Sequence, residues 1–214
     1  MGWLLSFEGY DPADQGRREA LCTLGNGVFA TRGAMPESRA DGVHYPGTYA
    51  AGVYDRVRDH VDGEPVDNES MVNLPNWLPL DIEVVGARFD PDRCGLLDHQ
   101  VQLDLRSAVL VRTFRFVDDA QRVTAVVQRR LVHMAAPHLA ALHTSVTAEN
   151  WTGELVVRSG LDAGVRNAGV ARYDRLDGQH LGEIGVGCSG QVPYVTARTR
   201  QSQVDVAWSV RAPP

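Results

Sequence analysis

The feature that most constrains the fold is a period-two alternation of apolar and polar side chains that begins near residue 96. One run covers residues 109–116 and a second covers 123–132, with the pair Asp118-Asp119 between them and Pro137 after the second run. Such alternation is typical of β-strands, whose successive side chains point to opposite faces of a sheet. Further runs of this kind cover 139–148 and 154–160. Segments of about 8–12 residues joined by short turns predict an antiparallel meander.

Outside this meander the pattern is less regular. Up to about Asp92, short apolar runs stand between Gly, Pro and Asp clusters, which predicts long N-terminal loops; only Asp14–Leu21 has helical character. We interpret residues 160–190 as longer loops, and 191–198 and 203–210 as two more strands. The expected fold is therefore mostly β, an antiparallel β-sandwich with long N-terminal loops, in one domain that spans residues 1–214.

Charge and cysteine content exclude several kinds of partner. The net charge of -6 disfavours a nucleic acid or an anionic membrane, both of which bind basic surfaces. No apolar stretch has the length of a membrane span. Three widely spaced cysteines without a CxxC pair favour free thiols in a reducing compartment, and the N-terminus has no export signal. These features predict a cytoplasmic location, with no nucleic acid and no membrane among the partners.

Three short blocks follow no secondary-structure period. The blocks Thr23–Gly33, His44–Tyr54 and Val72–Trp77 mix Gly, Asn and Pro with bulky side chains, which predicts shaped loops with anchored rings. Aromatic faces beside amide and imidazole groups suit sugars, which present apolar ring faces and hydroxyl edges. The alternative is that these rings only fasten the loops to the sandwich or to a neighbouring domain. The candidate substrate- or interdomain-contact residues are His44, Tyr45, Tyr49, Tyr54, Asn73, Asn76 and Trp77.

The sequence contains no pattern that predicts a catalytic or metal centre. The N-terminal carboxylates lie in turn-like stretches, and Glu69 is the best of a weak set of candidate acids. The motif Gly185–Gly190 matches GxGxxG but leads into a strand, whereas a phosphate site of this type requires a helix. The histidines form no HxxxH or HExxH pair, and no serine lies in a GxSxG elbow. We therefore expect no catalytic residue, no metal and no cofactor in this chain.

Four arginines, Arg112, Arg115, Arg129 and Arg130, lie inside the predicted strands. One interpretation is an anion- or sugar-binding groove on one face of the sheet. The simpler interpretation places them on the solvent side of half-exposed strands, with their aliphatic stems over apolar neighbours.

The three loop blocks resemble the N-terminal region of glycoside hydrolase family 65, which contains inverting maltose, trehalose and kojibiose phosphorylases and related hydrolases. Segments Arg129–Met134, Glu149–Trp151 and Asn167–Tyr173 are similar to the family as well. The resemblance implies a galactose-mutarotase-like supersandwich that packs on an (α/α)6 barrel and contributes to dimer contacts. The family's catalytic acid belongs to that barrel, and no segment here resembles it. The chain is therefore expected to be part of a longer protein.

Two functions are compatible with these observations. The first is a non-catalytic accessory domain of a family 65 disaccharide phosphorylase or hydrolase. This domain would be inactive alone, with the barrel, a second copy in a homodimer and a sugar as its partners. The second is a free-standing carbohydrate-binding or mutarotase-like sandwich. A mutarotase needs a His and a Glu that converge on one sheet face, and the candidates are His133, His143, Glu149 and Glu154.

Overall fold

The computed structural model describes residues 2–169, 171 and 174–212. Strands hold about 50% of the residues and helices about 5%, and the sheets are antiparallel, which confirms the predicted mostly β fold. The chain divides into two compact units: unit 1 holds Met1–Pro46 and Leu80–Ser159, and unit 2 holds Gly47–Pro79 and Gly160–Pro214. A single sandwich domain over residues 1–214 stays a prediction.

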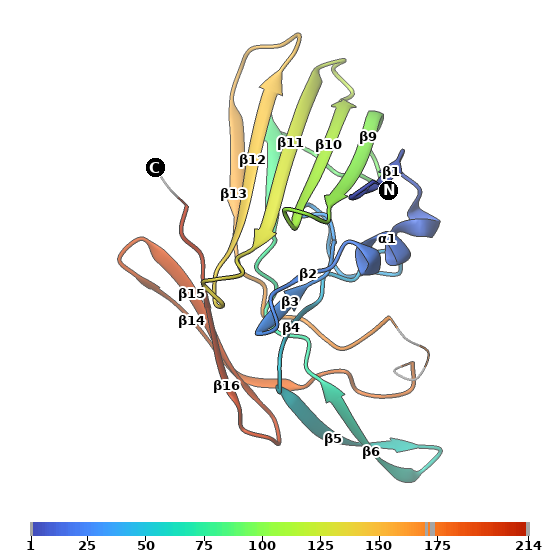
Figure 1. The fold of residues 1–214 in the computed structure, drawn as a ribbon, viewed down its shortest axis with the longest axis vertical. Coiled ribbons are helices and arrows are strands. Elements are labelled where there is room, and N and C mark those ends of the chain that lie inside the picture. Colours follow the sequence, from blue (N-terminus) through green and yellow to red (C-terminus); the bar gives the residue numbers. More distant parts are fainter. Residues whose placement is uncertain (1, 170, 172–173, 213–214) are drawn as a thin grey trace. The chain divides into compact units, whose positions relative to one another are not determined.

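Unit 1 is built on a five-stranded antiparallel sheet in the order β1-β9-β10-β11-β12 (Figure 1). Its strands are β1 (Leu4–Glu8), β9 (Gly95–Asp104), β10 (Val109–Val117), β11 (Val123–Val132) and β12 (Ala140–Ala148). A three-stranded sheet has the order β13-β7-β8, with β13 (Leu155–Ser159), β7 (Leu80–Val84) and β8 (Ala87–Arg88). Shorter elements of this unit are η1 (Pro12–Asp14), α1 (Gln15–Leu21), β2 (Leu24–Gly25) and β3 (Phe29–Thr31).

The central strands of the five-stranded sheet bury every second side chain, as the period-two pattern predicts. Arg112, Phe114 and Phe116 of β10 are buried, whereas Thr113 and Arg115 point to the opposite face. We call the face that carries the buried side chains the inner face and the opposite one the outer face. The same alternation of buried side chains continues in β9 and β11, which pair with β10 on either side.

Aspartates close the turns between these strands. Asp118 Oδ1 accepts hydrogen bonds from the backbone N–H groups of Ala120 and Arg122, both at 3.0 Å. Asp104 Oδ1 accepts one from the N–H of Arg106 at 2.8 Å. Such bonds satisfy backbone donors that leave the strand ladder where the chain reverses. The β10–β11 turn therefore lies where the aspartate pair predicts it.

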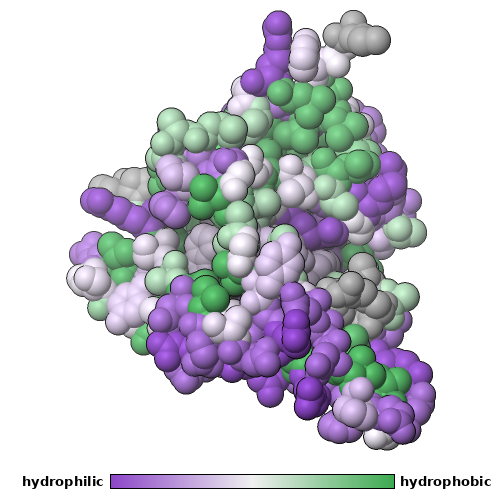
Figure 2. Space-filling model, turned by 60° about the horizontal axis from the view of Figure 1, so that its bottom comes forward, coloured by the Kyte–Doolittle hydropathy of each residue, from purple (hydrophilic) through white to green (hydrophobic). Residues whose placement is uncertain are grey.

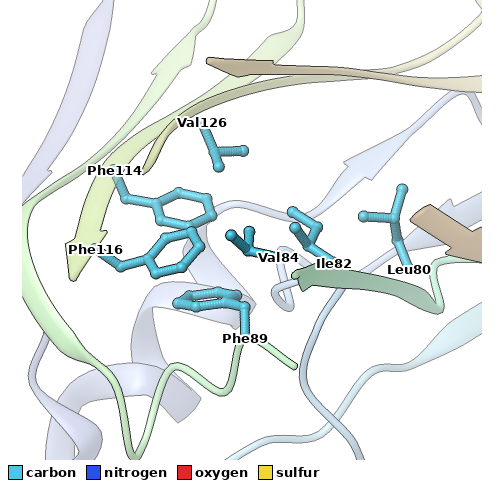
Figure 3. Close-up of a cluster of buried hydrophobic side chains, with 7 residues drawn as sticks. All are labelled: Leu80, Ile82, Val84, Phe89, Phe114, Phe116 and Val126. Carbon is cyan, nitrogen blue, oxygen red and sulfur yellow. The ribbon is translucent and has the colours of Figure 1, made fainter. Parts of the chain in front are cut away.

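A hydrophobic cluster on the inner face forms the core of unit 1 (Figure 3). The Phe89 ring centroid lies 5.1 Å from that of Phe114 and 4.4 Å from that of Phe116. The other buried members are Leu80, Ile82 and Val84 of β7 and Val126 of β11. Burying a side chain of this size stabilises the fold by about 1.5–3 kcal/mol. The cluster thus joins residues of both sheets of unit 1.

Unit 2 contains a hairpin and a three-stranded sheet. The hairpin consists of β5 (Tyr54–Val61) and β6 (Glu64–Met71), and the sheet has the order β14-β15-β16, with β14 (Leu181–Ser189), β15 (Val192–Thr199) and β16 (Asp205–Ser209). Strand β4 (Thr48–Ala50) precedes the hairpin. The core of this unit consists of Val53, Val72, Leu74, Val165, Leu181 and Ala197.

The region before Asp92 is not only loops, which corrects the sequence-based prediction. It contains β1, the β5–β6 hairpin and the β7–β8 pair. The β5–β6 turn is Asp62-Gly63, and both residues have positive φ. An Asp-Gly pair between two strands is a strong hairpin signal. Cross-strand ion pairs such as Arg56 Nε to Glu69 Oε2, at 3.0 Å, give these strands a charged composition that obscures the alternation.

Residues 160–190 also contain a strand, β14, where we expected loops. A Cβ atom added at Gly187 would lie 2.5 Å from the Tyr194 hydroxyl, and one at Gly185 would lie 2.6 Å from Thr196 Oγ1. Side chains of β15 therefore cover both glycines, which is why a strand here has a loop-like composition. Strand β13 also departs from the expected meander, because it pairs with β7.

The surface is mixed in polarity. Figure 2 shows apolar patches among hydrophilic ones on one face of the molecule. Val186 of β14 is the most exposed of the large apolar side chains of that strand, at 79%. Helix α1 has seven residues, and no helix in the described part of the chain has the length and apolar character of a membrane span.

Candidate functional site

Asn26, in the first of the three loop blocks, ties two connections of unit 1 together. Its Oδ1 accepts hydrogen bonds from the backbone N–H groups of Val28 (3.0 Å) and Phe29 (3.1 Å). Its Nδ2 donates to the carbonyl oxygens of His133 (2.8 Å) and Pro137 (2.9 Å). The side chain thus fixes the β2–β3 turn to the β11–β12 connection.

The glycines of this block serve chain geometry. Gly27 has a φ of 86°, in the left-handed region that favours glycine, whereas Gly25 is a strand residue of β2. A Cβ atom at Gly33 would lie 2.5 Å from the Cβ of Cys22. Gly33 therefore lets two backbone segments approach closely, and its N–H donates to the carbonyl of Glu19 at 2.7 Å.

His44 and Tyr45, two of the candidate contact residues, belong to a buried polar network around Glu19 of α1. Glu19 Oε1 lies 2.8 Å from His44 Nδ1, and Glu19 Oε2 accepts the backbone N–H of Tyr45 at 2.9 Å. His44 Nε2 lies 3.2 Å from the hydroxyl of Tyr10, which donates to Asp92. Burial and the Asp92 carboxylate raise the pKa of Tyr10, so the phenol keeps its proton as a donor.

The two candidate asparagines lie in unit 2 and bond to the backbone. Asn73 Oδ1 accepts the N–H of Thr48 at 3.0 Å, and its Nδ2 donates to the carbonyl of Arg166 at 3.0 Å. Asn76 Oδ1 accepts the N–H of Leu78 at 3.0 Å. Both asparagines are buried, so these amide groups anchor the loops that carry them.

The aromatic candidates of unit 2 are more accessible. Tyr54, the first residue of β5, is 46% exposed, and Tyr49 and Trp77 are half-buried. The N–H of Leu74 donates to the carbonyl of Thr48 at 2.8 Å. The second half of the His44–Tyr54 block therefore lies beside the Val72–Trp77 block. Whether these rings contact a sugar stays a prediction.

A second buried network centres on Arg112, which the simpler sequence interpretation places in solvent. Its Nη1 donates to Glu37 Oε2 at 2.5 Å and to Gln128 Oε1 at 3.1 Å, and its Nε donates to His99 Nε2 at 3.0 Å. His99 must then carry its proton on Nδ1, which lies 3.2 Å from the carbonyl oxygen of Gly9. Burial and the Arg112 charge lower the pKa of His99 to about 3. The imidazole is therefore a neutral acceptor at neutral pH.

The four strand arginines divide between the two faces of the sheet. Arg130 is buried on the inner face with the network arginine of β10, which corrects the solvent-side interpretation for both. Arg129 is exposed on the outer face, and Arg115 there pairs with Glu149 at 2.6 Å and Asp98 at 2.9 Å. Strand geometry requires this division, because residues one apart point to opposite faces.

A cleft of about 730 Å³ opens in unit 1 beside both networks. Glu37 and His44 of the networks line it together with Phe89 of the hydrophobic cluster. Most other lining side chains are charged: Arg39, Asp41, Arg88, Asp90, Asp92, Arg93, Asp118, Asp119 and Arg122. Small-molecule sites have volumes of about 300–1,000 Å³. The cleft therefore offers charged hydrogen-bond donors and acceptors, whereas Phe89 of its lining is itself buried in the core.

In the described part of the chain, every carboxyl group whose pKa departs from its ordinary value has a lowered pKa. Hydrogen bonds from Arg115 lower the pKa of Glu149, for example. The other groups of this kind are Asp14, Asp55, Asp67, Asp104, Asp118 and Asp205. Glu69 is exposed and pairs with Arg56 across the β5–β6 hairpin. A glycosidic general acid needs a raised pKa, so the displaced groups suit ion pairing rather than proton donation.

The four residues of the mutarotase hypothesis do not converge. His133 follows β11, where its Nδ1 accepts the N–H of Ala136 at 2.8 Å. Glu149 lies at the opposite end of that strand, because its N–H donates to the carbonyl of Val123 at 3.0 Å. At about 3.3 Å per residue, the length of β11 separates the two by roughly 30 Å. His143, midway along β12, is about 20 Å from Glu149 by the same measure, and Glu154 precedes β13 of the other sheet.

The remaining chemical motifs have structural explanations. The Gly185–Gly190 motif lies in β14 and the turn that follows, so it is no phosphate loop. Cys22 is buried as a small core residue, and burial raises the pKa of its thiol to about 11. Within the residues that the structure describes, no group of three His, Cys, Asp or Glu side chains is placed to hold a metal ion.

Comparison with known proteins covers nearly the whole chain. Residues 5–212 match the N-terminal domain of glycosyl hydrolase family 65. The chain belongs to this family. The resemblance carried by the three loop blocks is thereby confirmed. Of the family-like segment Asn167–Tyr173, the residues Val170, Arg172 and Tyr173 lie outside the described part of the structure.

Its relatives are longer proteins. The chain is 44% identical over 211 residues to an uncharacterized glycosyl hydrolase of Mycobacterium tuberculosis, covering 98% of this chain and 16% of the relative. It is 34% identical over 179 residues to a kojibiose phosphorylase of Caldanaerobacter subterraneus (84% and 22% covered) and 29% identical over 209 residues to a trehalose 6-phosphate phosphorylase of Lactococcus lactis (96% and 26%). The chain thus spans 16–26% of these curated relatives.

A solved structure supports the fold. The structure of a putative kojibiose phosphorylase from the human microbiome has a TM-score of 0.78 and 18% identity, over 97% of this chain and 30% of that one. At this identity the likeness concerns the fold alone.

Sequence reasoning missed the residues that organise the two networks. These are Tyr10, Glu19, Glu37 and Gln128. Gln128 had a usable signal, because it stands in phase with Val126 on the apolar side of a predicted strand, where a polar residue needs an internal partner. Glu37 lies in a segment without periodicity, so only its tertiary contacts show its role.

Proposed function

We propose that this chain is the non-catalytic N-terminal domain of a family 65 disaccharide phosphorylase or hydrolase. In the longer protein it packs on the catalytic (α/α)6 barrel, contributes to a homodimer and supports the mouth of the active site. The observation that carries this proposal is that the two buried glutamates are held in hydrogen bonds to neighbouring side chains and backbone. Glu19 bonds His44 and Tyr45, and Glu37 bonds Arg112 and Gln128. The geometry fits a scaffold in which carboxylates hold loops in place.

The proportions of the relatives support the same proposal. Proteins named as kojibiose and trehalose 6-phosphate phosphorylases contain a segment similar to this chain in about a quarter of their length. We assign the chemistry to the remaining part. The free cysteines fit a cytoplasmic protein of sugar metabolism.

The aromatic loop residues are the proposed contact surface. Tyr54, the most exposed of them, and Trp77 would meet the barrel, a second copy or a sugar. Trp77→Ala should weaken self-association of the chain in sedimentation while its thermal melt is retained. A loss of several kcal/mol, the range for an emptied core site, with unchanged association would assign the ring to the core instead.

An activity assay tests the non-catalytic role. The chain is incubated with maltose, trehalose and kojibiose, each with and without phosphate, and glucose and glucose 1-phosphate are measured. We expect neither product above a blank, whereas the full-length protein releases one of them with its own substrate. Product formation by the chain alone would overturn the proposal.

The cleft favours a second candidate function, carbohydrate binding by unit 1. Its volume of about 730 Å³ and the hydrogen-bonding groups of its charged lining fit a disaccharide. Calorimetric titration with the same three sugars tests this. Asp119→Ala, which removes a lining carboxylate, should weaken binding, and Glu69→Ala on the β5–β6 hairpin is the matched control. The absence of heat with every sugar would exclude this function for the three ligands.

A further inference from the structure

Arg130 is a buried cation that forms no ion pair with the carboxylates of the described residues. Its side chain lies on the inner face of β11 and is 4% exposed. Nη1 donates to the carbonyl of Ala34 at 3.0 Å, while Nε has no hydrogen-bond partner. No carboxylate of the described residues forms an ion pair with it. Moving a charge out of water without a partner costs free energy, so a bound counter-ion would stabilise this buried guanidinium.

The nearest carboxylates are already committed to other partners. Glu37 pairs with Arg112 and Gln128. Glu19 pairs with His44 and lies 3.6 Å from Arg32. Burial lowers the pKa of Arg130 to about 10, which still leaves it charged at neutral pH.

Arg112 has a second unpartnered donor. Its Nη2 is buried and has no hydrogen-bond partner among the described residues. Arg112 and Arg130 both line one small cavity of about 30 Å³. This volume exceeds the roughly 10–15 Å³ that one water needs, so the cavity admits something larger than a single water. Its other walls are mostly apolar: Ala34, Met35, Pro36, Val101, Leu110 and Leu142.

We propose that this cavity is a binding site for a small monovalent anion of halide size, with Arg112 Nη2 and Arg130 Nε as its donors. The charge count supports an anion over water, because Glu37 pairs with Arg112 and no described carboxylate forms an ion pair with Arg130. The volume and the apolar walls disfavour phosphate or sulfate, which are larger and lose more hydration free energy on burial. The bound anion would stabilise the segment of Ala34–Glu37 on the inner face.

Thermal unfolding of the chain against chloride tests the site. Chloride replaces gluconate at a constant ionic strength of about 0.2 M, so that general screening does not change. We expect the Tm to rise with chloride, with equal increments per tenfold once the concentration exceeds the Kd. Phosphate in place of chloride should give no such rise.

Two variants localise the effect. Arg130→Met removes one donor and should abolish the chloride-dependent rise in Tm. Arg129→Met is the matched control, since Arg129 is the adjacent residue on the exposed outer face, and it should keep the full rise. An equal rise in both variants would overturn the proposal.

Crystals grown in bromide give a readout that does not depend on any variant. An anomalous peak within hydrogen-bond distance of Arg112 Nη2 and Arg130 Nε is the expected result. A site occupied by water only, or a Tm of the unmodified chain that is identical in chloride and gluconate, would refute anion binding. Either result leaves the proposed accessory function intact, because that function is tested by activity.

Discussion

The substitution Glu37→Gln isolates the buried ion pair of unit 1. The Glu37 and Arg112 side chains are 1% and 6% exposed, and Oε2 and Nη1 are 2.5 Å apart. The amide keeps the shape but removes the negative charge. It offers one acceptor oxygen, whereas the carboxylate accepts from both Arg112 and Gln128. Arg112 would then remain a buried cation without a carboxylate.

The expected cost is large relative to total stability. Removing one partner of a buried ion pair costs about 3–5 kcal/mol, against roughly 5–15 kcal/mol for unfolding a whole domain. For a chain of this length, about 2–4 °C per kcal/mol converts this loss to a fall in Tm of roughly 6–20 °C. Adding Arg112→Met to Glu37→Gln should recover part of the loss, because no unpaired charge of the pair remains.

Urea denaturation at fixed chloride measures this effect. The transition midpoint should fall for Glu37→Gln with little change in the denaturant slope, since the surface exposed on unfolding is similar. Glu69→Gln is the control: Glu69 and Arg56 are both more than half exposed, and such surface pairs contribute about 0–1 kcal/mol. A loss below about 1 kcal/mol for Glu37→Gln would refute the reasoning that this network holds the fold together.

Three further perturbations have defined outcomes. Burial raises the pKa of Asp55, but backbone N–H groups of Ser202 and Gln201 outweigh it and leave the pKa below its ordinary value. The ionised carboxylate therefore stabilises unit 2 above the unfolded pKa of about 3.9 and loses this effect as pH falls through the lower folded pKa. Asp55→Asn should lower the Tm at pH 7 and flatten its acid dependence, and an unchanged acid limb would contradict this assignment. Asn26→Ala should cost roughly 1–3 kcal/mol in urea denaturation, because two backbone donors and two carbonyls lose their partner; a neutral effect would mean that water replaces the amide. Gly187→Ala should lower the Tm by displacing the Tyr194 ring, and Tyr194→Ala in the same chain should relieve that clash; additive losses would show that the ring does not cover the glycine.

The sequence by itself determined the central meander. Strands β9 to β12 and the turn at Asp118 follow from alternation and turn chemistry, which are local properties of the chain. Family membership was likewise readable from the residues of the loop blocks. Alternation and turn chemistry need no knowledge of distant contacts.

Strands with an atypical composition required the structure. The β5–β6 hairpin has a charged composition because ion pairs form across its strands, and β14 has glycines because β15 side chains cover them. In both cases the residue types of the strand are explained by contacts with the neighbouring strand, and not by the strand's own hydrophobicity. Propensity and alternation do not contain that information.

The polar networks were decided by tertiary structure alone. Arg112 and Arg129 look alike in the sequence, yet one is buried and the other exposed. The difference arises because a covering segment places Glu37 against the inner face, and a buried guanidinium is stable only where such a partner meets it. Which loop crosses which face depends on contacts between residues about 75 positions apart in the chain, and no periodic pattern records those contacts.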